Sequence, residues 1–420
     1  MNFISICSGI EAASAAFHPL GWTPIAFSEI EPFPCAVLDR HYPLVPNLGD
    51  MKKFRDWPEE IFANADVLVG GPPCQAFSRA GARNGLDDAR GNLTLTYAEL
   101  INHADAVRIN SGKSPAIIVY ENVPGILSDR TNGFGHLLGA LAGHGAPIPV
   151  PPGHKRWSNA GVVAGPQRTL AWRVLDAQYF GVPQRRRRVF LVGCSAGSGR
   201  DPSEILFERQ GVQGNIAAGR KKGTPVAALT ANGVGTCGAD DNQSQAGHLI
   251  PVVCGGIVER AFSFALRGRD GGALPEIHKD GQSIGSLRAS GGGSSRDYIA
   301  FGGNNTSGPI DIATAVNACA SASGRMDFES ETFVVEPAGC KPAANGSMAP
   351  VALLVPIAGE TQWMVRRLTP IECARLQGFP DHHLDIAYRN KPAADGPKYK
   401  ALGNSMAVPV MRWIGKRIAS

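Results

Sequence analysis

The sequence lacks the features of a secreted, a membrane-spanning or a zinc-binding protein. A secretory signal peptide has a basic segment followed by an apolar stretch, and the first thirty residues have no such basic segment. The only candidate apolar stretch is interrupted by Glu11, His18 and Glu29. No run reaches the roughly 18 apolar residues of a membrane span. The 9 cysteines are odd in number and nowhere form Cys-x-x-Cys, which argues against a disulfide framework and a structural zinc site. We therefore expect a cytoplasmic protein with no metal, no membrane contact and mostly buried thiols.

Charged residues are also scarce, at 18% of the chain, and the net charge is only +5. Such a mild surplus permits a polyanionic partner but does not establish one. Glycine and proline are abundant, with 51 and 31 residues, which together exceed the roughly 12% of an average protein. Part of the chain is therefore rich in loops, while 420 residues are ample for one large domain or for two or three ordinary ones.

Short β-rich runs alternate with helix-like stretches as far as residue 194. The runs are Phe3–Ile6, Thr23–Phe27, Asp66–Val69, Ala116–Tyr120 and Val189–Val192. Such alternation is typical of βαβ units on a parallel sheet. It predicts an α/β fold with a Rossmann-like, doubly wound and mostly parallel sheet.

The composition changes after residue 194. Residues 195–350 hold 26 of the 51 glycines and contain three weakly similar segments, which begin "PVAALTANG", "SIGSLRASG" and "DIATAVNAC". These segments indicate repeated loops or hairpins, with a low-complexity linker as the alternative. Regular patterns return later, with a helix begun by Thr369 and Pro370 and a final amphipathic helix capped by Asn404 or Ser405. We expect domains at 1–194 and 195–365, followed by a return to the first pattern at 366–420.

The strongest local signal is the segment "DVLVGGPPCQAFSRAG", in which a β-run ends directly before Cys74. Gly70 and Gly71 let a ligand approach the backbone closely, and the rings of Pro72 and Pro73 fix the backbone dihedral φ at these two positions. Open α/β sheets place their sites at this end of their strands. A thiol is mostly protonated at pH 7, so a nucleophilic cysteine needs positive charge nearby. An isolated cysteine is more often a small buried residue, but this setting favours a nucleophile.

A second run, "AIIVYENVPGIL", delivers Glu121 to its carboxyl end. If the two strands are parallel neighbours, the Glu121 carboxylate reaches the same edge of the sheet as Cys74. A closed apolar site raises the pKa of a glutamic acid, so that it can carry a proton at neutral pH. The pair suggests covalent attack on a ring assisted by proton donation, and a purely structural strand-end carboxylate is the alternative.

Four consecutive arginines lead into the strand "VFLVGC". Because alternate residues of a strand share a face, Gln184, Arg186 and Arg188 are expected on one side and Arg185 and Arg187 on the other. One face can then meet the site while the other meets solvent or phosphate. A wholly solvated run is the alternative.

Acidic residues at strand ends indicate a nucleoside ligand. The loop "SICSGIEA" has a glycine between a strand and a helix but is not a full Gly-x-Gly-x-x-Gly. Glu29, with Glu31 beside it, follows the second run, where an acidic residue can accept hydrogen bonds from both ribose hydroxyls. Asp50 follows in "NLGDM" and can bond an adenine amino group. A nucleoside without a phosphate cradle points to S-adenosylmethionine rather than to a dinucleotide.

Together these segments resemble the DNA cytosine carbon-5 methyltransferase family, whose ordered blocks the chain matches from end to end. The blocks are "SICSGIEA", "SEIE", "GD" at Gly49-Asp50, "GGPPCQAFS", "DDARGNL", "ENV", "QRRRR", "RRLTPIECARLQGFP" and "GNSMAVPV". The glycine-rich middle falls where the family keeps its variable target-recognition region. The style of the sequence is similar to that of phage, prophage and restriction-modification members.

The resemblance implies a set of roles for the residues of the site. Cys74 adds to ring position 6 of a cytosine flipped out of the DNA stack, and Glu121 protonates or hydrogen-bonds ring nitrogen 3. Arg186 and Arg188 hold the oxygen of the base and the backbone. The expected DNA-contacting residues are Gln75, Ser78 and Gln184.

The resemblance also implies the cofactor site. The positions carried over for S-adenosylmethionine are Phe3, Ser8, Gly9, Ile10, Glu29, Asp50, Gly71, Leu93 and Asn404. Since Asn404 lies near the end of the chain, the final helix must fold back onto the amino-terminal sheet and complete the catalytic domain. The family commonly has a second glycine where Glu11 stands, so the Glu11 side chain is expected to turn outward.

The expected activity is methylation of carbon 5 of a cytosine in a specific sequence of double-stranded DNA, by a monomer that uses S-adenosylmethionine. A transfer-RNA methyltransferase is one alternative, although the "PPCQAFS" form and the long variable region disfavour it. A catalytically silent DNA-binding protein is another, although the set of Cys74, Glu121 and Arg188 argues against it. The target sequence, a cognate restriction endonuclease and the biological role stay open.

Overall fold

The computed structural model describes residues 1–72, 92–207, 263–269, 272–278, 295–298, 333–337 and 363–420. The chain separates into two compact units, and each is described here by itself. The first comprises Met1–Gly219, Ala374–Ala393 and Lys400–Ser420, and the second Arg220–Cys373 and Ala394–Tyr399. Most of the predicted domain at 195–365, with the three weakly similar segments, lies outside the described residues, so the predicted division into domains stays a prediction.

The first unit is built on a seven-stranded sheet of order β2-β1-β3-β4-β7-β6-β5. Its strands are β1 (Asn2–Ile6), β2 (Thr23–Ser28), β3 (Val67–Gly70), β4 (Ile117–Asn122), β5 (Ala160–Ala164), β6 (Arg168–Asp176) and β7 (Arg187–Ser195). The pairs β1·β2, β1·β3 and β3·β4 are parallel, whereas β4·β7, β6·β7 and β5·β6 are antiparallel. The predicted α/β fold is confirmed, but the sheet is mixed, with three parallel and three antiparallel pairs, rather than mostly parallel as predicted.

The error has a physical origin in the hairpin of β5 and β6. Neither strand shows the continuous apolar run of a buried parallel strand, because β5 alternates between exposed and half-buried residues and β6 begins with Arg168. The guanidinium of Arg168 is nevertheless fully buried, where it pairs with the carboxylate of Asp105 and donates to the carbonyl of Leu141 at 3.0 Å. A charged residue inside a strand thus concealed a core position.

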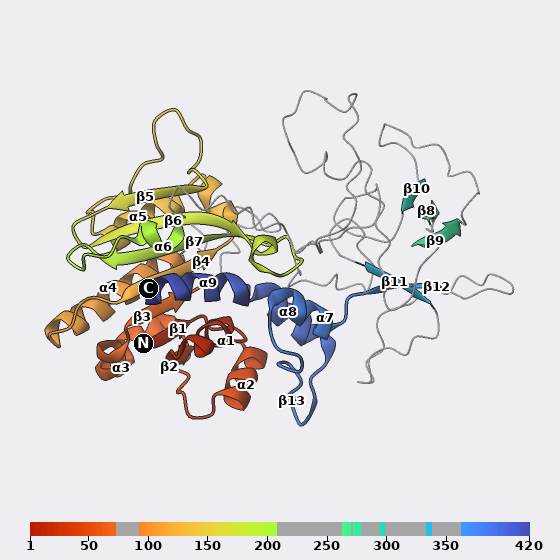
Figure 1. Cartoon of the computed structure of the whole chain (residues 1–420), viewed down its shortest axis with the longest axis horizontal. Coiled ribbons are helices and arrows are strands. Elements are labelled where there is room, and N and C mark those ends of the chain that lie inside the picture. Colours follow the sequence, from red (N-terminus) through yellow and green to blue (C-terminus); the bar gives the residue numbers. More distant parts are fainter. Residues whose placement is uncertain (73–91, 208–262, 270–271, 279–294, 299–332, 338–362) are drawn as a thin grey trace. The chain divides into compact units, whose positions relative to one another are not determined.

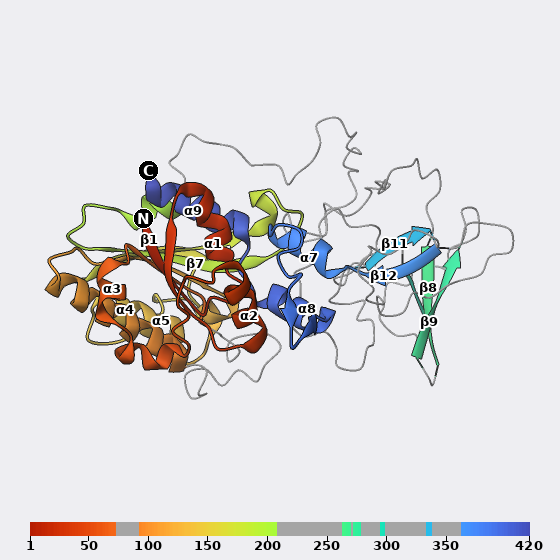
Figure 2. The same ribbon diagram turned by 90° about the horizontal axis from the view of Figure 1, so that it is seen from below.

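Helices cover both faces of the sheet (Figure 1). The helices of the described residues are α1 (Ala12–Phe17), α2 (Pro32–His41), α3 (Glu59–Asn64), α4 (Asn92–Asn110), α5 (Gly133–Ala142), α6 (Pro202–Leu206), α7 (Pro370–Gln377), α8 (Asp395–Asn404) and α9 (Val408–Ala419), with 3₁₀ turns η1 (His18–Leu20), η2 (Met51–Asp56), η5 (Pro124–Ser128) and η6 (Ala177–Phe180). The helices α3, α4 and α5 pack together on one face and α1 and α9 on the other, as Figure 2 shows.

The final helix returns to the amino-terminal part of the sheet, as predicted. It packs so closely on α1 that a Cβ at Gly415 would lie 2.8 Å from the ring of Phe17. Its cap is not the predicted one, because Ala407 occupies the N-cap position and makes no side-chain hydrogen bond, while Pro409 stands in the first turn. Proline fixes a helical φ at that position without needing a cap partner. The prediction that Asn404 or Ser405 caps this helix was wrong.

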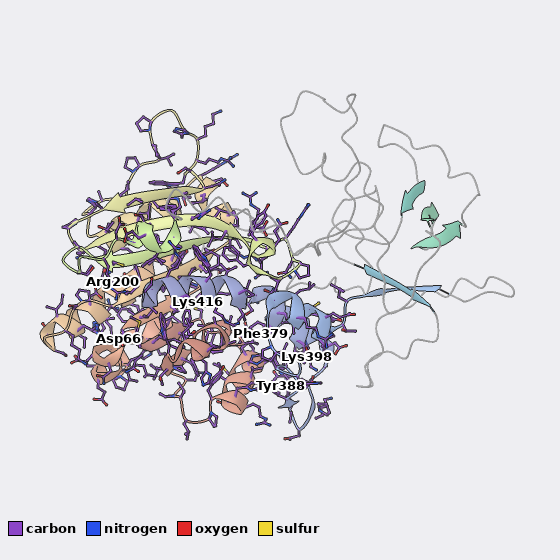
Figure 3. All side chains as sticks on the ribbon, viewed as in Figure 1. Asp66, Arg200, Phe379, Tyr388, Lys398 and Lys416 are labelled. Carbon is purple, nitrogen blue, oxygen red and sulfur yellow. The ribbon has the colours of Figure 1, made fainter. Side chains whose placement is uncertain are left out.

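The segment between α7 and α8 also belongs to the first unit. It carries the two-residue strands β13 (Ala387–Tyr388) and β14 (Lys391–Pro392), which pair with each other. The ring of Tyr388, which is labelled in Figure 3, meets that of Phe33 in α2 edge-on, with centroids 5.3 Å apart. This contact fastens the C-terminal segment beside the end of β2.

The second unit contains two small antiparallel sheets within its described part. One has the order β10-β8-β9, from β8 (Ser263–Arg269), β9 (Gly272–His278) and β10 (Ser295–Tyr298), and the other pairs β11 (Phe333–Pro337) with β12 (Trp363–Arg367).

The predicted start of α7 is confirmed, since the Thr369 N–H donates to Glu372 Oε2 at 2.7 Å and the Glu372 N–H donates to Thr369 Oγ1 at 3.3 Å. This reciprocal pair is a capping box.

Candidate active site

The carboxyl ends of three adjacent parallel strands meet at one edge of the sheet. Ile6 of β1 pairs with Gly70 of β3, which in turn pairs with Tyr120 of β4. The segments that follow these strands therefore lie side by side, where open α/β sheets place their ligands. A pocket opens among them, lined by Ser5, Cys7, Ser8, Gly9, Ala12, Ala13, Gly71, Glu121, Asn404, Ser405 and Met406.

The loop between β1 and α1 forms one wall of this pocket. Its backbone is left-handed at Cys7 (φ 53°), Gly9 (φ 57°) and Glu11 (φ 65°). The Gly9 N–H donates to Glu29 Oε2 at 2.7 Å. Glu29 Oε1 accepts the backbone N–H groups of Ile30 and Glu31, each at 2.8 Å. Glu29 thus ties the end of β2 to the loop, at the place where the sequence predicts a ribose-binding carboxylate.

Glu11 does not turn outward, so that expectation was wrong. The residue is 0% exposed, and its Oε1 accepts both the N–H of Ser14 at 2.8 Å and the Ser14 hydroxyl at 2.9 Å. The physical reason is that the first turn of α1 offers N–H groups without helical partners, which a carboxylate satisfies. Burial raises the pKa of Glu11 to about 7, against the opposing effect of the serine hydrogen bonds.

Glu121 stands at the carboxyl end of β4, and only 8% of it is exposed. Because β3 and β4 are parallel neighbours, it reaches the edge at which β3 ends, as predicted. Arg188 Nε lies 3.3 Å from Glu121 Oε1, within ion-pair distance but without the alignment of a hydrogen bond. Burial raises the pKa of Glu121, and the charges of Arg188 and Arg186 oppose that shift. Burial thus favours the protonated form of Glu121, while the two arginines favour its carboxylate.

Gly71 leaves room between Glu121 and the opposite wall of the pocket. A Cβ at Gly71 would lie 2.8 Å from Met406 Cε and 3.5 Å from Glu121 Oε2. A Cβ on the preceding Gly70 would overlap the buried ring of Tyr97. The absence of a side chain at Gly71 therefore leaves space in the pocket, whereas its absence at Gly70 leaves space for the packing of the core.

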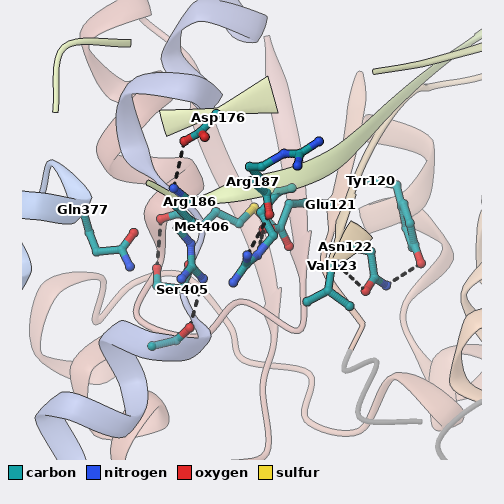
Figure 4. Close-up of polar contacts among 12 residues, drawn as sticks. Tyr120, Glu121, Asn122, Val123, Asp176, Arg186, Arg187, Gln377, Ser405 and Met406 are labelled. Carbon is teal, nitrogen blue, oxygen red and sulfur yellow. Dashed lines mark hydrogen bonds and ion pairs between the residues drawn. The ribbon is translucent and has the colours of Figure 1, made fainter. Parts of the chain in front are cut away.

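Arg186 is buried and holds the C-terminal segment against the sheet (Figure 4). Its Nη2 donates to the carbonyl of Gly403 at 2.9 Å and to that of Ser405 at 2.5 Å, on either side of Asn404. Its own backbone N–H donates to Asp176 Oδ1 at 2.9 Å. The guanidinium thus positions the turn that carries Asn404 into the pocket.

The predicted alternation along the arginine run is confirmed only in part, because Arg185 is half-buried like Arg188 and the strand β7 begins only at Arg187. Gln184 and Arg186 are buried, Arg188 is half-buried beside Glu121, and Arg187 is exposed. Burial lowers the pKa of Arg186 to about 9, with the charge of Arg188 adding to the shift and that of Glu121 opposing it. The contacts of Gln184 with DNA and of the two arginines with a base stay predictions.

The predicted cofactor residues fall into two groups. Ser8, Gly9, Gly71 and Asn404 meet at the pocket together with the predicted catalytic Glu121. The other five do not line it: Glu29 accepts the N–H of Gly9, Phe3 and Ile10 are fully buried in the core, Leu93 packs against the core, and Asp50 caps η2 by accepting a backbone N–H at 3.0 Å. The predicted residues Cys74, Gln75 and Ser78 lie outside the described residues.

The sequence did not indicate part of the pocket lining, namely Ser5, Cys7, Ala12, Ala13, Ser405 and Met406. The position of Ser405 and Met406 directly after Asn404 is the signal that could have found two of them. Burial and then the charges of Glu29 and Asp50 raise the pKa of the Cys7 thiol to about 12, which disfavours the nucleophilic thiolate.

The described residues contain no group of three or more His, Cys, Asp or Glu side chains that could hold a metal ion. In the same part of the chain, every helix is too short or too polar to cross a membrane.

Phage and bacterial methyltransferases are similar to this chain in sequence. The DNA N-6-adenine-methyltransferase of Escherichia phage P1 is 40% identical across 99% of this chain, which spans 60% of that relative's length. The type II methyltransferase M2.BsuMI of Bacillus subtilis is 30% identical across 50% of this chain and 45% of its own length. The orphan methyltransferase M.SPRI of Bacillus phage SPR is 24% identical across 100% of this chain and 97% of its own length.

Among solved structures, the Dnmt2 methyltransferase of S. pombe matches 100% of this chain and 98% of its own, with a TM-score of 0.51 and 14% identity. This likeness concerns the fold. The mixed sheet and the pocket at its carboxyl edge define an α/β protein of the methyltransferase fold class. The pattern of the C-5 cytosine-specific DNA methylases matches residues 1–217 and 315–420. The chain belongs to the C-5 cytosine-specific DNA methylase family.

Proposed function

We propose that this protein transfers the methyl group of S-adenosylmethionine to carbon 5 of a cytosine in a specific sequence of double-stranded DNA, through a covalent bond to Cys74. The observation that carries the proposal is the position of Glu121. It is buried beside Gly71 at the edge of the sheet where the segment leading to Cys74 begins, with Arg188 3.3 Å away and its pKa raised. A buried carboxyl group whose pKa is raised is suited to protonate a pyrimidine ring to which a thiolate adds.

The residues of the pocket fit the cofactor. Beside the pocket, Glu29 Oε1 already accepts two backbone N–H groups, whereas Oε2 accepts only that of Gly9, so Oε2 has one lone pair left for a hydrogen bond from a ribose hydroxyl. Gly9 leaves open space where a Cβ would stand, and Asn404 offers an amide at the opposite wall. When bound, S-adenosylmethionine supplies an electrophilic methyl group on a sulfonium.

Carbon 5 of cytosine is too weak a nucleophile to take a methyl group by itself, so residues of the protein must activate it. The Cys74 thiolate bonds to ring carbon 6, and ring nitrogen 3 receives a proton from Glu121, so that electron density gathers at carbon 5. Carbon 5 then takes the methyl group. Loss of the proton on carbon 5 to a base restores the double bond and expels the thiolate, while nitrogen 3 returns its proton to Glu121. Arg188, beside Glu121, holds the oxygen of the base.

Access to carbon 6 requires the base to leave the helix. A thiolate must approach from above the ring plane, which stacking blocks, so the cytosine is flipped out at a cost of a few kcal/mol. Gln75, Ser78 and Gln184 are proposed to contact the DNA, and residues 195–365 to read the target sequence. Exchange of residues 195–350 for those of another family member should transfer the sequence preference.

The name of the phage P1 relative supports a second candidate, methylation of adenine at its amino nitrogen. The alignment covers 60% of that protein, so the named activity can reside in the remaining part. An amino nitrogen needs no covalent activation, whereas the segment before Cys74 and the buried Glu121 suit a carbon nucleophile. Cytosine is therefore the favoured substrate.

The test is to incubate the protein with methyl-labelled S-adenosylmethionine and either mixed-sequence duplex DNA or transfer RNA, and to digest each product to nucleosides. Label in 5-methylcytosine from DNA supports the proposal. Label in methyladenine would establish the second candidate, and label only in transfer RNA would make the substrate RNA. A Cys74→Ala variant should bind the cofactor as well as the wild type does but transfer no methyl group.

A further inference from the structure

The wall of the pocket between β1 and α1 is a strained loop. Cys7 and Glu11 are not glycines, yet both have the left-handed φ that side chains disfavour, with Gly9 between them also left-handed. Such residues cost of order 1 kcal/mol or more each, and they persist only where the surrounding structure holds them in place. The anchors of this loop therefore decide the shape of the pocket.

Two anchors come from the end of the neighbouring strand β2. The Ser8 N–H donates to the carbonyl of Ser28 at 3.1 Å, and the Gly9 N–H donates to Glu29. Within the loop, the Glu11 N–H donates to the carbonyl of Ser8 at 3.0 Å. These bonds satisfy N–H groups of the loop. None of them involves the carbonyl of Ile10, a fully buried residue, which therefore needs a donor from another part of the chain.

The partner of that carbonyl lies more than 370 positions along the chain. His383 Nε2 is 2.8 Å from the Ile10 oxygen, and because a carbonyl only accepts, the ring must donate from Nε2. His383 is itself fixed, since its ring stacks on His41 with centroids 4.5 Å apart and on Phe379 with centroids 4.8 Å apart. In addition, His41 Nε2 donates to the carbonyl of His383 at 2.8 Å. The ring is 7% exposed and belongs to the C-terminal segment of the first unit.

We propose that His383 is a positioning residue for the cofactor, which fixes the loop Cys7–Glu11 in its binding conformation through the hydrogen bond to Ile10. This inference rests on the proposed function in one respect, because it takes the pocket to be the cofactor site. His383 touches no pocket atom of its own and acts through the loop. The stacked His41 supports it by holding the His383 backbone.

The chain offers variants that separate the hydrogen bond from the stacking. His383→Phe keeps a flat ring between His41 and Phe379 but has no donor. His383→Gln loses the ring but has an amide N–H about as far from the backbone as Nε2, so it is the rescuing variant. His382→Asn is the matched control, because His382 has φ 63° and a side chain that is 69% exposed, and asparagine tolerates a left-handed backbone.

Two measurements test the proposal. Titration calorimetry with S-adenosylhomocysteine, the stable demethylated product of the cofactor, should show a dissociation constant about tenfold higher for His383→Phe, as expected for an unpaired buried carbonyl. The His383→Gln and His382→Asn variants should bind within about twofold of the wild type. In methyl transfer, His383→Phe should raise KM for the cofactor and leave kcat nearly unchanged.

Amide hydrogen exchange on the protein without cofactor gives a readout independent of activity. The N–H groups of Ser8, Gly9 and Glu11 should exchange faster in His383→Phe than in the wild type, and His383→Gln should restore their protection. Equal exchange and equal affinity in all variants would overturn the role of His383. If the wild type binds no S-adenosylhomocysteine while the exchange results hold, the proposed function fails and the anchoring of the loop stands.

Discussion

Replacement of Glu11 by glutamine should stabilise the protein at alkaline pH but not at acid pH. Burial raises the pKa of the Glu11 carboxyl from 4.5 to about 7 in the folded protein, whereas the unfolded chain leaves it near its ordinary value. Between these two values the folded protein binds a proton that the unfolded chain has lost. The free energy of unfolding therefore falls as the pH rises through this window and stays low above it.

The size of the effect follows from the shift. A difference of about 2.5 pKa units corresponds to roughly 3 kcal/mol of unfolding free energy. Glutamine has no proton to lose in this range, and its side-chain oxygen can still accept the N–H of Ser14, which Glu11 accepts at 2.8 Å. The stability of Glu11→Gln relative to the wild type should therefore improve by roughly 3 kcal/mol between pH 4.5 and pH 8.

Urea unfolding at pH 4.5 and at pH 8, followed by tryptophan fluorescence, measures this difference. The matched control is Glu31→Gln, which removes an exposed carboxylate that pairs with Lys400 at 2.8 Å and should contribute less than about 1 kcal/mol at either pH. A stability difference between Glu11→Gln and the wild type that is the same at both pH values would refute the reasoning, because it would mean that Glu11 titrates alike in the folded and unfolded chain.

Three further predictions concern other contacts of the site. Arg186→Met removes the two hydrogen bonds to the carbonyls on either side of Asn404, so the affinity for S-adenosylhomocysteine measured by calorimetry should fall several-fold. An unchanged affinity would show that the turn keeps its conformation without Arg186. Gly71→Ala places a Cβ 2.8 Å from the flexible end of Met406 and should cost about 1 kcal/mol in urea unfolding, whereas Gly70→Ala meets a rigid buried ring and should cost about 2–3 kcal/mol; equal costs would be inconsistent with the packing. Burial lowers the pKa of His383 from 6.5 to about 4, so the stability due to its neutral ring is complete above pH 6.5 and is lost as the pH falls to 4, and His383→Gln should unfold with a weaker dependence on pH over that range; an identical pH dependence would contradict this.

The sequence predicted the parts of the site that depend on local pattern. Apolar runs located β1, β2, β3, β4 and β7, and the assumption that β3 and β4 are parallel neighbours placed Glu121 correctly at the edge of the sheet. Gln184 and Arg186 are buried, as the alternation predicted, but they precede β7, which begins at Arg187, so the period of a strand does not explain their burial. Local patterns therefore located the strands and Glu121 at the edge of the sheet.

The remaining features depend on contacts between distant segments. The buried Arg168 made β6 look polar, and its partner Asp105 lies 63 positions away, so the antiparallel half of the sheet was not predicted. Glu11 turned inward because the first turn of α1 provides donors, which the comparison with a family glycine did not reveal. The anchoring of Ile10 by His383 has no local signature, since a histidine between two aromatic rings becomes visible only in the folded chain.

The most direct test of the central claim uses random-sequence duplexes in which 5-fluorocytosine replaces cytosine. Because fluorine cannot leave as a proton does, methyl transfer should stop with the base bonded to the protein, and mass spectrometry should find the adduct on the peptide that contains Cys74, with none in Cys74→Ala. A wild-type protein that forms 5-methylcytosine in ordinary duplexes but yields no adduct at Cys74 with the fluorinated ones would contradict the account.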